Sequence, residues 1–256
     1  TDPYSWYEEN NISLITGERA TRVNREQKLV ETESGQEIPY DICIFATGSN
    51  AFVLPIPGHE LPSVIGWRTI EDTERMIEIA QTKKEAIVIG GGLLGLECAR
   101  GLLDQGMNVT VVHLAEWLME MQLDRQAGEM LREDLEKQGM RFELGANTKE
   151  ILGENDVEGI RLADGRELPA DLVVMAVGIR PFVQEAKDSG LDVERGIVVD
   201  DFMRTSDENI YAVGECAQHN GKVYGLVAPL YEQGKVLADY LTDRDTDGYK
   251  GSTTFT

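Results

Sequence analysis

The chain has 256 residues, 41% of them hydrophobic and 27% charged, with a formal net charge of −22 at pH 7. This composition indicates a soluble globular protein with one large domain or two of ordinary size. It argues against a membrane-spanning helix, which needs about 18 consecutive apolar residues, and against nucleic acid or an anionic membrane surface as a partner, because either would repel the negative charge.

A β-meander is the first structure that the chain predicts. Residues 11–24 ("NISLITGERATRVN") and 28–34 ("KLVETES") have the character of strands, with Gly35 in the turn after them. The next stretch, "GQEIPYDICIFATG" at 35–48, returns as "GRELPADLVVMAVG" at 165–178, with six identities in fourteen positions. Chance similarity between two hairpins is the alternative, but this number of identities favours a duplicated unit.

The clearest motif lies in "EAIVIGGGLLGLECARGLLDQGMNVTVVH", residues 85–113. Residues 86–89 predict a buried parallel strand, 96–103 a helix that Gly106 ends, and 109–112 a second strand. Gly90, Gly92 and Gly95 have G-x-G-x-x-G spacing between strand and helix. In such a unit the glycines allow a tight turn, the approach of a pyrophosphate, and close helix packing, while the helix N-terminus attracts phosphate. This context disfavours the alternative of a turn without a ligand.

An acidic residue about 20 positions after such a loop usually binds the adenosine ribose. Here the second strand ends at His113, and Glu116 follows three residues later. Two interpretations of His113 stay open. It is either a polar residue that closes the strand, or an imidazole that binds a ribose hydroxyl and, if protonated, tolerates a 2′-phosphate. Because no Arg or Lys follows at once, NADH is favoured over NADPH as the cofactor.

Residues 124–138 predict a helix that Gly139 ends, and short alternating segments follow as far as residue 178. "ADG" at 163–165 is a hairpin turn signal. The later copy of the repeated stretch therefore closes the unit that Gly90 opens. If the same distance separates a glycine loop from the earlier copy as separates Gly90 from the later copy, that loop would lie before residue 1. We therefore expect two duplicated nucleotide-binding domains, of which the first lacks its opening strand and loop in this chain.

The C-terminal part of the sequence predicts a short strand and then a helix. "TSDENIYAVGECA" (205–217) contains the strand and ends near Gly214 and Glu215, and "APLYEQGKVLADYL" (228–241) reads as a helix with Pro at its start. A carboxylate at a strand end before a helix lies at the carboxyl edge of a sheet, where α/β folds bind ligands. The alternative for Glu215 is a solvated acid at a strand end.

The three cysteines, Cys43, Cys98 and Cys216, have neither zinc nor disulfide spacing, which suits a reducing cytoplasm. We expect Cys43 in a buried strand and Cys98 in the core, and no metal site. Structural packing is favoured for Cys216 over a redox role, because free cysteine usually behaves as a buried apolar residue. The polar, acidic N-terminal residues do not form a signal peptide.

Together these pieces resemble the FAD-dependent pyridine nucleotide-disulfide oxidoreductases. The resemblance covers nearly the whole chain and rests on "ATGS" (46–49), "GGGLLGLE" (90–97), "AVGIRP" (176–181) and "NIYAVGECA" (209–217). Within the family the chain is most similar to the flavin module of NAD(P)H nitrite reductase large subunits, on the basis of "LMEMQLD" (118–124), "GECA" (214–217) and "YGLVAP" (224–229).

The resemblance implies an α/β fold in which a Rossmann-like NAD(P)-binding domain, residues 81–182, has a parallel sheet and a β-meander. Residues 1–80 and 183–256 would be parts of a truncated FAD-binding domain of the same type. Hydride transfer between the two cofactors needs orientation, so no side chain is assigned as an acid or base catalyst. For NADH, the implied binding residues are Gly90, Gly92 and Gly95 at the pyrophosphate, Glu97 at the nicotinamide carboxamide, and Gly178 beside the nicotinamide. For the flavin, they are Thr47 and Gly48 along the nucleotide, Glu215, preceded by Gly214, at the ribityl chain, and Val227 and Ala228 near the ring.

The expected function is hydride transfer from NAD(P)H to FAD, feeding a sirohaem and iron–sulfur centre that reduces nitrite to ammonia. Sirohaem and its [4Fe-4S] cluster would belong to parts of the parent protein that are missing here, and FAD binding by this chain alone is in question. The expected partners are NAD(P)H and an electron-acceptor domain or small redox protein, with a homo-oligomer left open. The alternatives are a stand-alone rubredoxin or ferredoxin reductase, an NADH oxidase-type flavoprotein, or a nucleotide-binding fragment without turnover.

Overall fold

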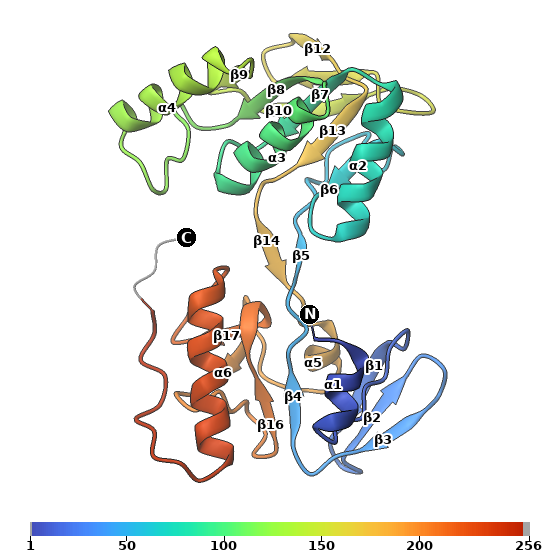
Figure 1. The fold of residues 1–256 in the computed structure, drawn as a ribbon, viewed down its shortest axis with the longest axis vertical. Helices are drawn as coiled ribbons and strands as arrows, with labels where there is room; N and C mark the ends of the chain where they lie inside the picture. Colours follow the sequence, from blue (N-terminus) through green and yellow to red (C-terminus); the bar gives the residue numbers. More distant parts are fainter. Residues whose placement is uncertain (1, 253–256) are drawn as a thin grey trace. The chain divides into compact units, whose positions relative to one another are not determined.

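The computed structural model describes residues 2–252, which form two compact units (Figure 1). One unit, here called the meander unit, contains the described residues up to Gly48 and those from Pro181 onward. The other, here called the glycine-loop unit, contains Ser49–Arg180. The sequence-based division placed residues 49–80 with the first domain. In the structure they belong to the glycine-loop unit, because one of their strands joins its parallel sheet.

A five-stranded parallel sheet forms the centre of the glycine-loop unit, in the order β6-β13-β7-β8-β9. Its strands are β6 (Val64–Gly66), β7 (Glu85–Ile89), β8 (Asn108–His113), β9 (Arg141–Leu144) and β13 (Leu172–Met175). The unit also contains the helices α2 (Ile70–Thr82), α3 (Leu93–Asp104) and α4 (Arg125–Lys137), the meander strands β10 (Thr148–Leu152), β11 (Gly159–Leu162) and β12 (Glu167–Pro169), and the strand β5 (Ser49–Ala51).

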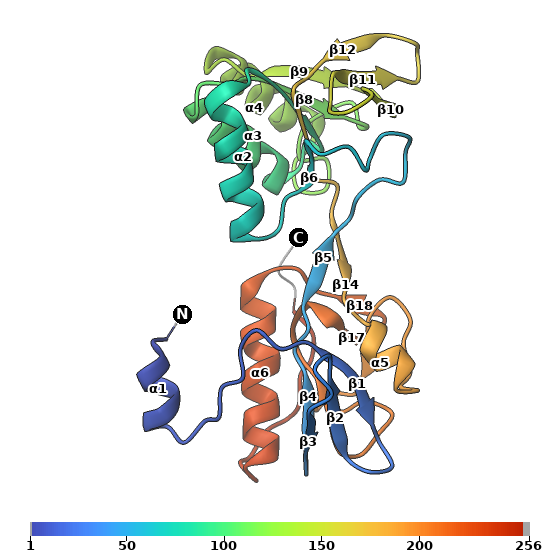
Figure 2. The ribbon, with the colours of Figure 1, turned by 90° about the vertical axis from the view of Figure 1, so that its right-hand side faces the viewer.

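Successive residues of the central strands pack on opposite faces of this sheet. Ala86 and Val88 of β7 join Cys98 and Leu102 of α3 in one apolar cluster. Ile87 and Ile89 join residues of the meander β10-β11-β12 in another. Helices and meander therefore cover opposite faces of the sheet (Figure 2). Because both faces are buried, the strands read as continuous apolar runs in the sequence instead of alternating with polar residues.

The meander unit combines three small sheets, in the orders β1-β2-β3, β16-β4 and β15-β17-β18. The strands β4 and β16 pair in parallel, and their register places Cys43 opposite Ile210. The elements of the unit are α1 (Tyr4–Glu9), β1 (Ala20–Asn24), β2 (Leu29–Thr32), β3 (Glu37–Pro39), β4 (Cys43–Phe45), α5 (Gln184–Asp188), β15 (Ile197–Val199), β16 (Ile210–Ala212), the 3₁₀ turn Gly214–Cys216, β17 (Ala217–His219), β18 (Lys222–Val223) and α6 (Val227–Leu241). A further strand, β14 (Ile179–Pro181), pairs with β5 of the glycine-loop unit, to which Ile179 and Arg180 also belong.

The two meanders have the same pairing register, as a duplicated unit predicts. Leu29 faces Pro39 in one meander, and Gly159 faces Pro169 at the matching place in the other. Each first hairpin also carries an irregularity at its first pair. The strands that follow the meanders differ in their neighbours. The strand β13 lies between β6 and β7, whereas β4 pairs with β16 alone within residues 2–252. A counterpart of β7 is thus absent from the described part of the meander unit.

Most of the elements predicted around the glycine motif are present within a few residues of the expected bounds. The prediction that Cys43 lies in a buried strand is wrong in part, because Cys43 is only half-buried on β4, which pairs with β16 alone within residues 2–252. The C-terminal helix is present as α6, but β17 and β18 separate it from Glu215. None of the helices in the described residues has the length and apolar character needed to cross a bilayer.

Candidate nucleotide-binding site

The turn between β7 and α3 requires glycine at two positions for steric reasons. Gly90 has a φ of +121°, and a Cβ atom there would lie 2.3 Å from the carbonyl oxygen of Ala176. A Cβ atom on Gly95 would lie 1.9 Å from the carbonyl oxygen of Gly90. Both distances are far below van der Waals contact, so a side chain at Gly90 would displace the chain after β13, and one at Gly95 would push α3 away from the loop. These two glycines place the start of α3 at the carboxyl end of β7.

Gly92 has a different environment, because no atom lies within 4 Å of a Cβ built on it. Gly92 is also the N-cap of α3, so no side chain caps the helix, and the first turn contains no acidic residue. The first N–H groups of a helix lack partners within the helix and carry a partial positive charge. Open space in front of an uncapped helix N-terminus is the geometry that a pyrophosphate needs, so the loop fits a dinucleotide.

His113, at the end of β8, is buried behind this loop. A Cβ atom on Gly91 would lie 2.7 Å from the imidazole ring of His113 and 2.9 Å from the side chain of Leu118. The Gly91 N–H donates to Nδ1 of His113 at 3.0 Å, and Nε2 lies 2.8 Å from Oε2 of Glu120. Both ring nitrogens of His113 are therefore engaged within the protein.

Glu116, the other predicted ribose residue, points elsewhere. Its carboxylate is largely exposed and forms an ion pair with Arg125 at 3.3 Å. Sequence reasoning singled out His113 and Glu116 but missed Glu120, which lies seven residues after His113 in "LMEMQLD". Sequence spacing did not reveal that contact, because a loop brings the carboxylate back to the strand end.

Glu97 and Gly178 are the remaining predicted residues in this unit. Glu97 lies on the exposed side of α3, and its carboxylate has no hydrogen bond or ion pair within residues 2–252. Gly178 is exposed with a φ of +105°, and its carbonyl oxygen accepts the N–H of Phe52 at 2.9 Å. A free carboxylate and an exposed glycine both leave room for a polar ligand at these positions.

Six predicted flavin residues lie in the meander unit. Thr47 Oγ1 donates to the carbonyl oxygen of Phe182 at 2.7 Å, and Gly48 has a φ of +68° with open space around a Cβ position. Gly214 and Glu215 begin the 3₁₀ turn after β16, and Glu215 is buried. Val227 and Ala228 start α6, which has no side-chain cap, and both are exposed.

The meander unit also contains a cavity of about 340 Å³ beside β4. Its lining is mainly apolar and includes Phe45, Phe182 and the predicted flavin residue Thr47. Glu185 also lines it, and its buried Oε2 has no hydrogen-bond partner within the described residues. An apolar recess with few polar groups fits part of a flavin nucleotide. The pyrophosphate of FAD, however, has no glycine loop in the described part of this unit.

The cysteine thiols are not arranged for redox chemistry. All three are free, and Cys98 and Cys216 are buried. Burial raises the pKa of the Cys98 thiol to about 12 and that of the Cys43 thiol to about 11, and burial also raises the pKa of Cys216. These thiols stay protonated near neutral pH, and a thiol without thiolate character is a poor nucleophile.

The class of protein follows from the duplicated units, the glycine loop and a comparison with known families. A family model described as pyridine nucleotide-disulphide oxidoreductase matches residues 5–234, so the chain belongs to this family. The predicted α/β fold is confirmed, and the chain is of the FAD- and NAD(P)H-dependent oxidoreductase class.

Comparison with individual proteins shows which members of this family the chain resembles. The chain is 55% identical to a nitrite reductase [NAD(P)H] of Bacillus subtilis (strain 168), over 97% of this chain and 31% of that protein. It is 42% identical to the nitrite reductase (NADH) large subunit of Escherichia coli (strain K12), over 92% of this chain and 28% of that subunit. The chain therefore spans about three tenths of the length of these relatives. The crystal structure of a ferredoxin reductase from Rhodopseudomonas palustris matches 98% of this chain and 63% of its own, with a TM-score of 0.89 and 32% identity.

Proposed function

We propose that this chain is the part of an NAD(P)H nitrite reductase that takes hydride from NADH onto FAD. Electrons would then pass to a sirohaem and [4Fe-4S] centre in the rest of the polypeptide, where nitrite is reduced to ammonia. The names of the two nitrite reductases that it resembles support this role. The observation that carries the nicotinamide part is the open space at Gly92 in front of the uncapped N-terminus of α3.

The proposed binding roles follow the geometry of each unit. Backbone N–H groups at Gly92 would bind the NADH pyrophosphate, while Gly90 and Gly95 hold the helix in place. The exposed, unpaired carboxylate of Glu97 would accept a hydrogen bond from the nicotinamide carboxamide, and Gly178 would leave room for the ring. In the meander unit the proposed flavin contacts are Thr47, Gly48, Gly214, Glu215, Val227 and Ala228.

The flavin supplies the two-electron chemistry, and the protein has to bind, orient and shield the reacting groups. Hydride transfer depends on close, aligned approach of two flat rings, which positioning groups achieve without an acid or base catalyst. The site residues proposed above are glycines, two carboxylates, one threonine and two small apolar residues, which suits positioning. The buried, protonated thiols take no part in this scheme.

A second candidate is a reductase that delivers electrons to a separate small redox protein. The chain is 34% identical to the rubredoxin-NAD(+) reductase of Pseudomonas putida, over 89% of this chain and 60% of that protein. The likeness to the ferredoxin reductase structure supports the same role. The identity to this reductase is lower than to the nitrite reductases, so we prefer the first proposal. A cytoplasmic location and a homo-oligomer stay predictions.

Two measurements test the proposal. The first is the absorption spectrum of this chain after loading with FAD and removal of the excess. A flavin band that NADH bleaches supports hydride transfer within these residues, and Gly92→Ala should slow the bleaching. A colourless protein that still binds NADH would instead support the alternative given by the sequence, a nucleotide-binding fragment without turnover.

The second measurement uses the polypeptide that carries this chain in its source organism. Absorption bands of sirohaem and NADH-dependent consumption of nitrite are expected. A flavoprotein without sirohaem that reduces rubredoxin or ferredoxin, and leaves nitrite unchanged, would overturn the nitrite reductase assignment in favour of the second candidate.

A further inference from the structure

The strand end that should carry the ribose-binding acid carries His113 instead, and its ring is already occupied. The side chain of His113 is 10% exposed. Because Nδ1 accepts the Gly91 N–H, the hydrogen of the neutral ring lies on Nε2, where it can be donated to Glu120. His113 therefore has no ring nitrogen left for a ribose hydroxyl.

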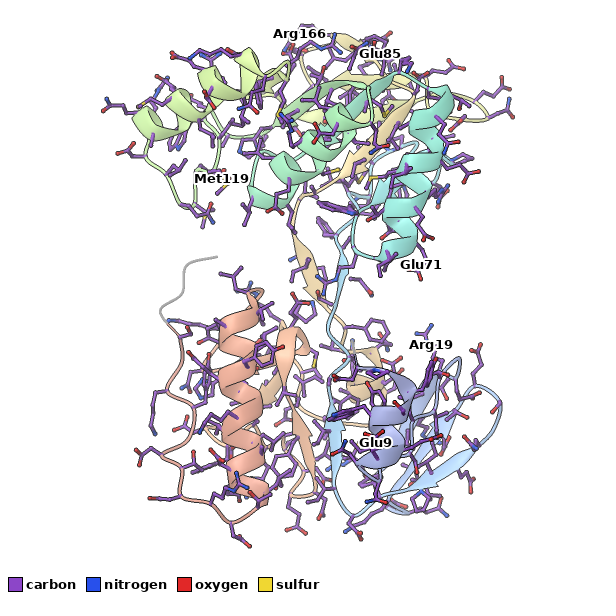
Figure 3. The ribbon with its side chains drawn as sticks, viewed as in Figure 1. Glu9, Arg19, Glu71, Glu85, Met119 and Arg166 are labelled. Carbon is purple, nitrogen blue, oxygen red and sulfur yellow. The ribbon has the colours of Figure 1, made fainter. Side chains whose placement is uncertain are left out.

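The loop that carries Glu120 is fixed against the glycine loop. The N–H of Met119 donates to the carbonyl oxygen of Gly91 at 3.1 Å, and Leu118 is fully buried. The carbonyl oxygen of Met119 accepts N–H groups from Gln122 and Leu123, both at 2.8 Å. Met119 has a φ of +55°, in the left-handed region that residues other than glycine adopt uncommonly. Figure 3 labels Met119 on this loop, between β8 and α4.

The Glu120 carboxylate is placed to receive a ligand. One carboxylate oxygen, Oε2, is 2.8 Å from Nε2 of His113, and the Glu120 side chain is 33% exposed. Within residues 2–252, His113 is its sole hydrogen-bond partner and no Lys or Arg pairs with it. Its second oxygen is therefore able to accept a hydrogen bond. Glu116 differs on each of these points, since its side chain is 69% exposed and is paired with Arg125.

We infer that Glu120 takes the place of the acid missing from the end of β8. It accepts the adenosine ribose hydroxyls and selects NADH against NADPH, and His113 is its positioning residue. This assignment rests on the proposed function, because it requires the loop at Gly92 to bind a nicotinamide dinucleotide. The Glu120 oxygen that His113 does not engage can accept hydrogen bonds from the ribose diol through its lone pairs, but the carboxylate repels the 2′-phosphate of NADPH and cannot receive a hydrogen bond from it.

The test is equilibrium binding of NADH and of NADPH to this chain, measured by fluorescence titration. Wild type should bind NADH more tightly. Glu120→Gln should reduce the ratio of the two dissociation constants by about tenfold, the effect of a charged hydrogen bond lost to one ligand and repulsion removed from the other. Glu133→Gln makes the same charge change on an exposed residue of α4 and should leave the ratio at the wild-type value.

A double-mutant cycle tests the positioning role of His113. His113→Gln alone should reduce the ratio, but it should have no further effect in a chain that already carries Glu120→Gln, because His113 acts through Glu120. The ratio is insensitive to partial unfolding, which lowers the apparent affinity for both dinucleotides equally. Additive effects of the two substitutions would overturn this role.

The remaining outcomes separate this assignment from the proposed function. If Glu120→Gln keeps the wild-type ratio, or if Glu116→Gln changes it instead, the assignment is wrong while the dinucleotide site stands. If wild type binds neither NADH nor NADPH, the proposed function fails and the assignment fails with it.

Discussion

The fully buried side chain of Gln233 accepts a hydrogen bond from the backbone N–H of Gly214, with 2.9 Å between the two atoms. Gly214 has a φ of +87° and begins the 3₁₀ turn that contains Glu215. Gln233 lies on α6, whose first residues are Val227 and Ala228. This bond therefore joins the two segments of the meander unit to which we assign flavin contacts.

Replacing Gln233 with Leu should destabilise the meander unit by about 1 kcal/mol. The Gly214 N–H would lose its partner, which costs about 1–3 kcal/mol. Part of this cost is offset, because the Nε2 group of Gln233 has no partner within the described residues and would be removed as well. Urea unfolding at equilibrium measures the difference. Glu232→Leu, on the exposed side of the same helix, is the matched control, and an equal loss in both variants would contradict this explanation.

Alanine at Gly95 should lower the stability of the chain, whereas alanine at Gly92 should weaken dinucleotide binding. At Gly95 the new methyl group would lie 1.9 Å from a backbone oxygen, so we expect a loss of about 1–3 kcal/mol or more in the free energy of unfolding. At Gly92 the methyl group meets nothing within 4 Å, and the φ of −85° suits any residue. Stability should therefore change little, while the methyl group blocks the approach of the pyrophosphate.

Thermal unfolding and NADH titration distinguish the two variants. Gly92→Ala should keep the melting temperature of the wild type and weaken NADH binding by about tenfold or more, the equivalent of about 1.4 kcal/mol. Unchanged NADH affinity in a folded Gly92→Ala chain would show that the dinucleotide binds elsewhere.

The strand–loop–helix unit from β7 to β8 could be predicted from the sequence because its signals are local. Apolar strand residues, glycine spacing and helical periodicity all lie within residues 85–113. The helix α2 gave a weaker signal, because only Met76 and Ala80 are buried and most of its other positions are polar or exposed. Its N-terminal capping box, formed by Thr69 and Asp72, is the one local signal in the sequence for where this helix begins.

Other features depend on contacts that local patterns do not reveal. The hairpin β17–β18 turns at Asn220 and Gly221, both with positive φ, so an Asn-Gly signal was present but its strands are very short. Glu120 had no signal of its own. It reaches His113 only because Leu118 and Met119 fix the intervening loop against Gly91. Long-range packing, and not sequence spacing, creates that part of the candidate site.

The cysteine thiols should react slowly with a thiol reagent in the folded chain. Cys98 and Cys216 are buried, and Cys43 is half-buried on β4. With the pKa of Cys43 raised to about 11 by burial, little thiolate is present at pH 8. We expect Cys43 to react first and slowly, and the other two only after denaturation. Mass spectrometry after timed labelling identifies the sites, and rapid native labelling of Cys216 would contradict the packing described here.

Asp156 should stabilise the glycine-loop unit above pH 4 and lose this effect in acid. Burial alone would raise the pKa of its carboxyl, but hydrogen bonds from Lys83, Ser63 and Val157 hold that pKa well below its usual range. A carboxyl whose folded pKa lies below the unfolded value, about 3.9, contributes stability above that value. The contribution disappears as the pH falls through the folded pKa.

Asp156→Asn should therefore destabilise the chain at pH 7 and do so progressively less below about pH 4, where the wild-type carboxylate also becomes protonated in the unfolded state. Urea unfolding of both proteins between pH 7 and pH 3 measures the difference in their free energies of unfolding. Asp41→Asn, at an exposed position in the meander unit, controls for the change in net charge. A difference that stays constant from pH 7 to pH 3 would mean that Asp156 acts through its shape and neutral hydrogen bonds, and not through its charge next to Lys83.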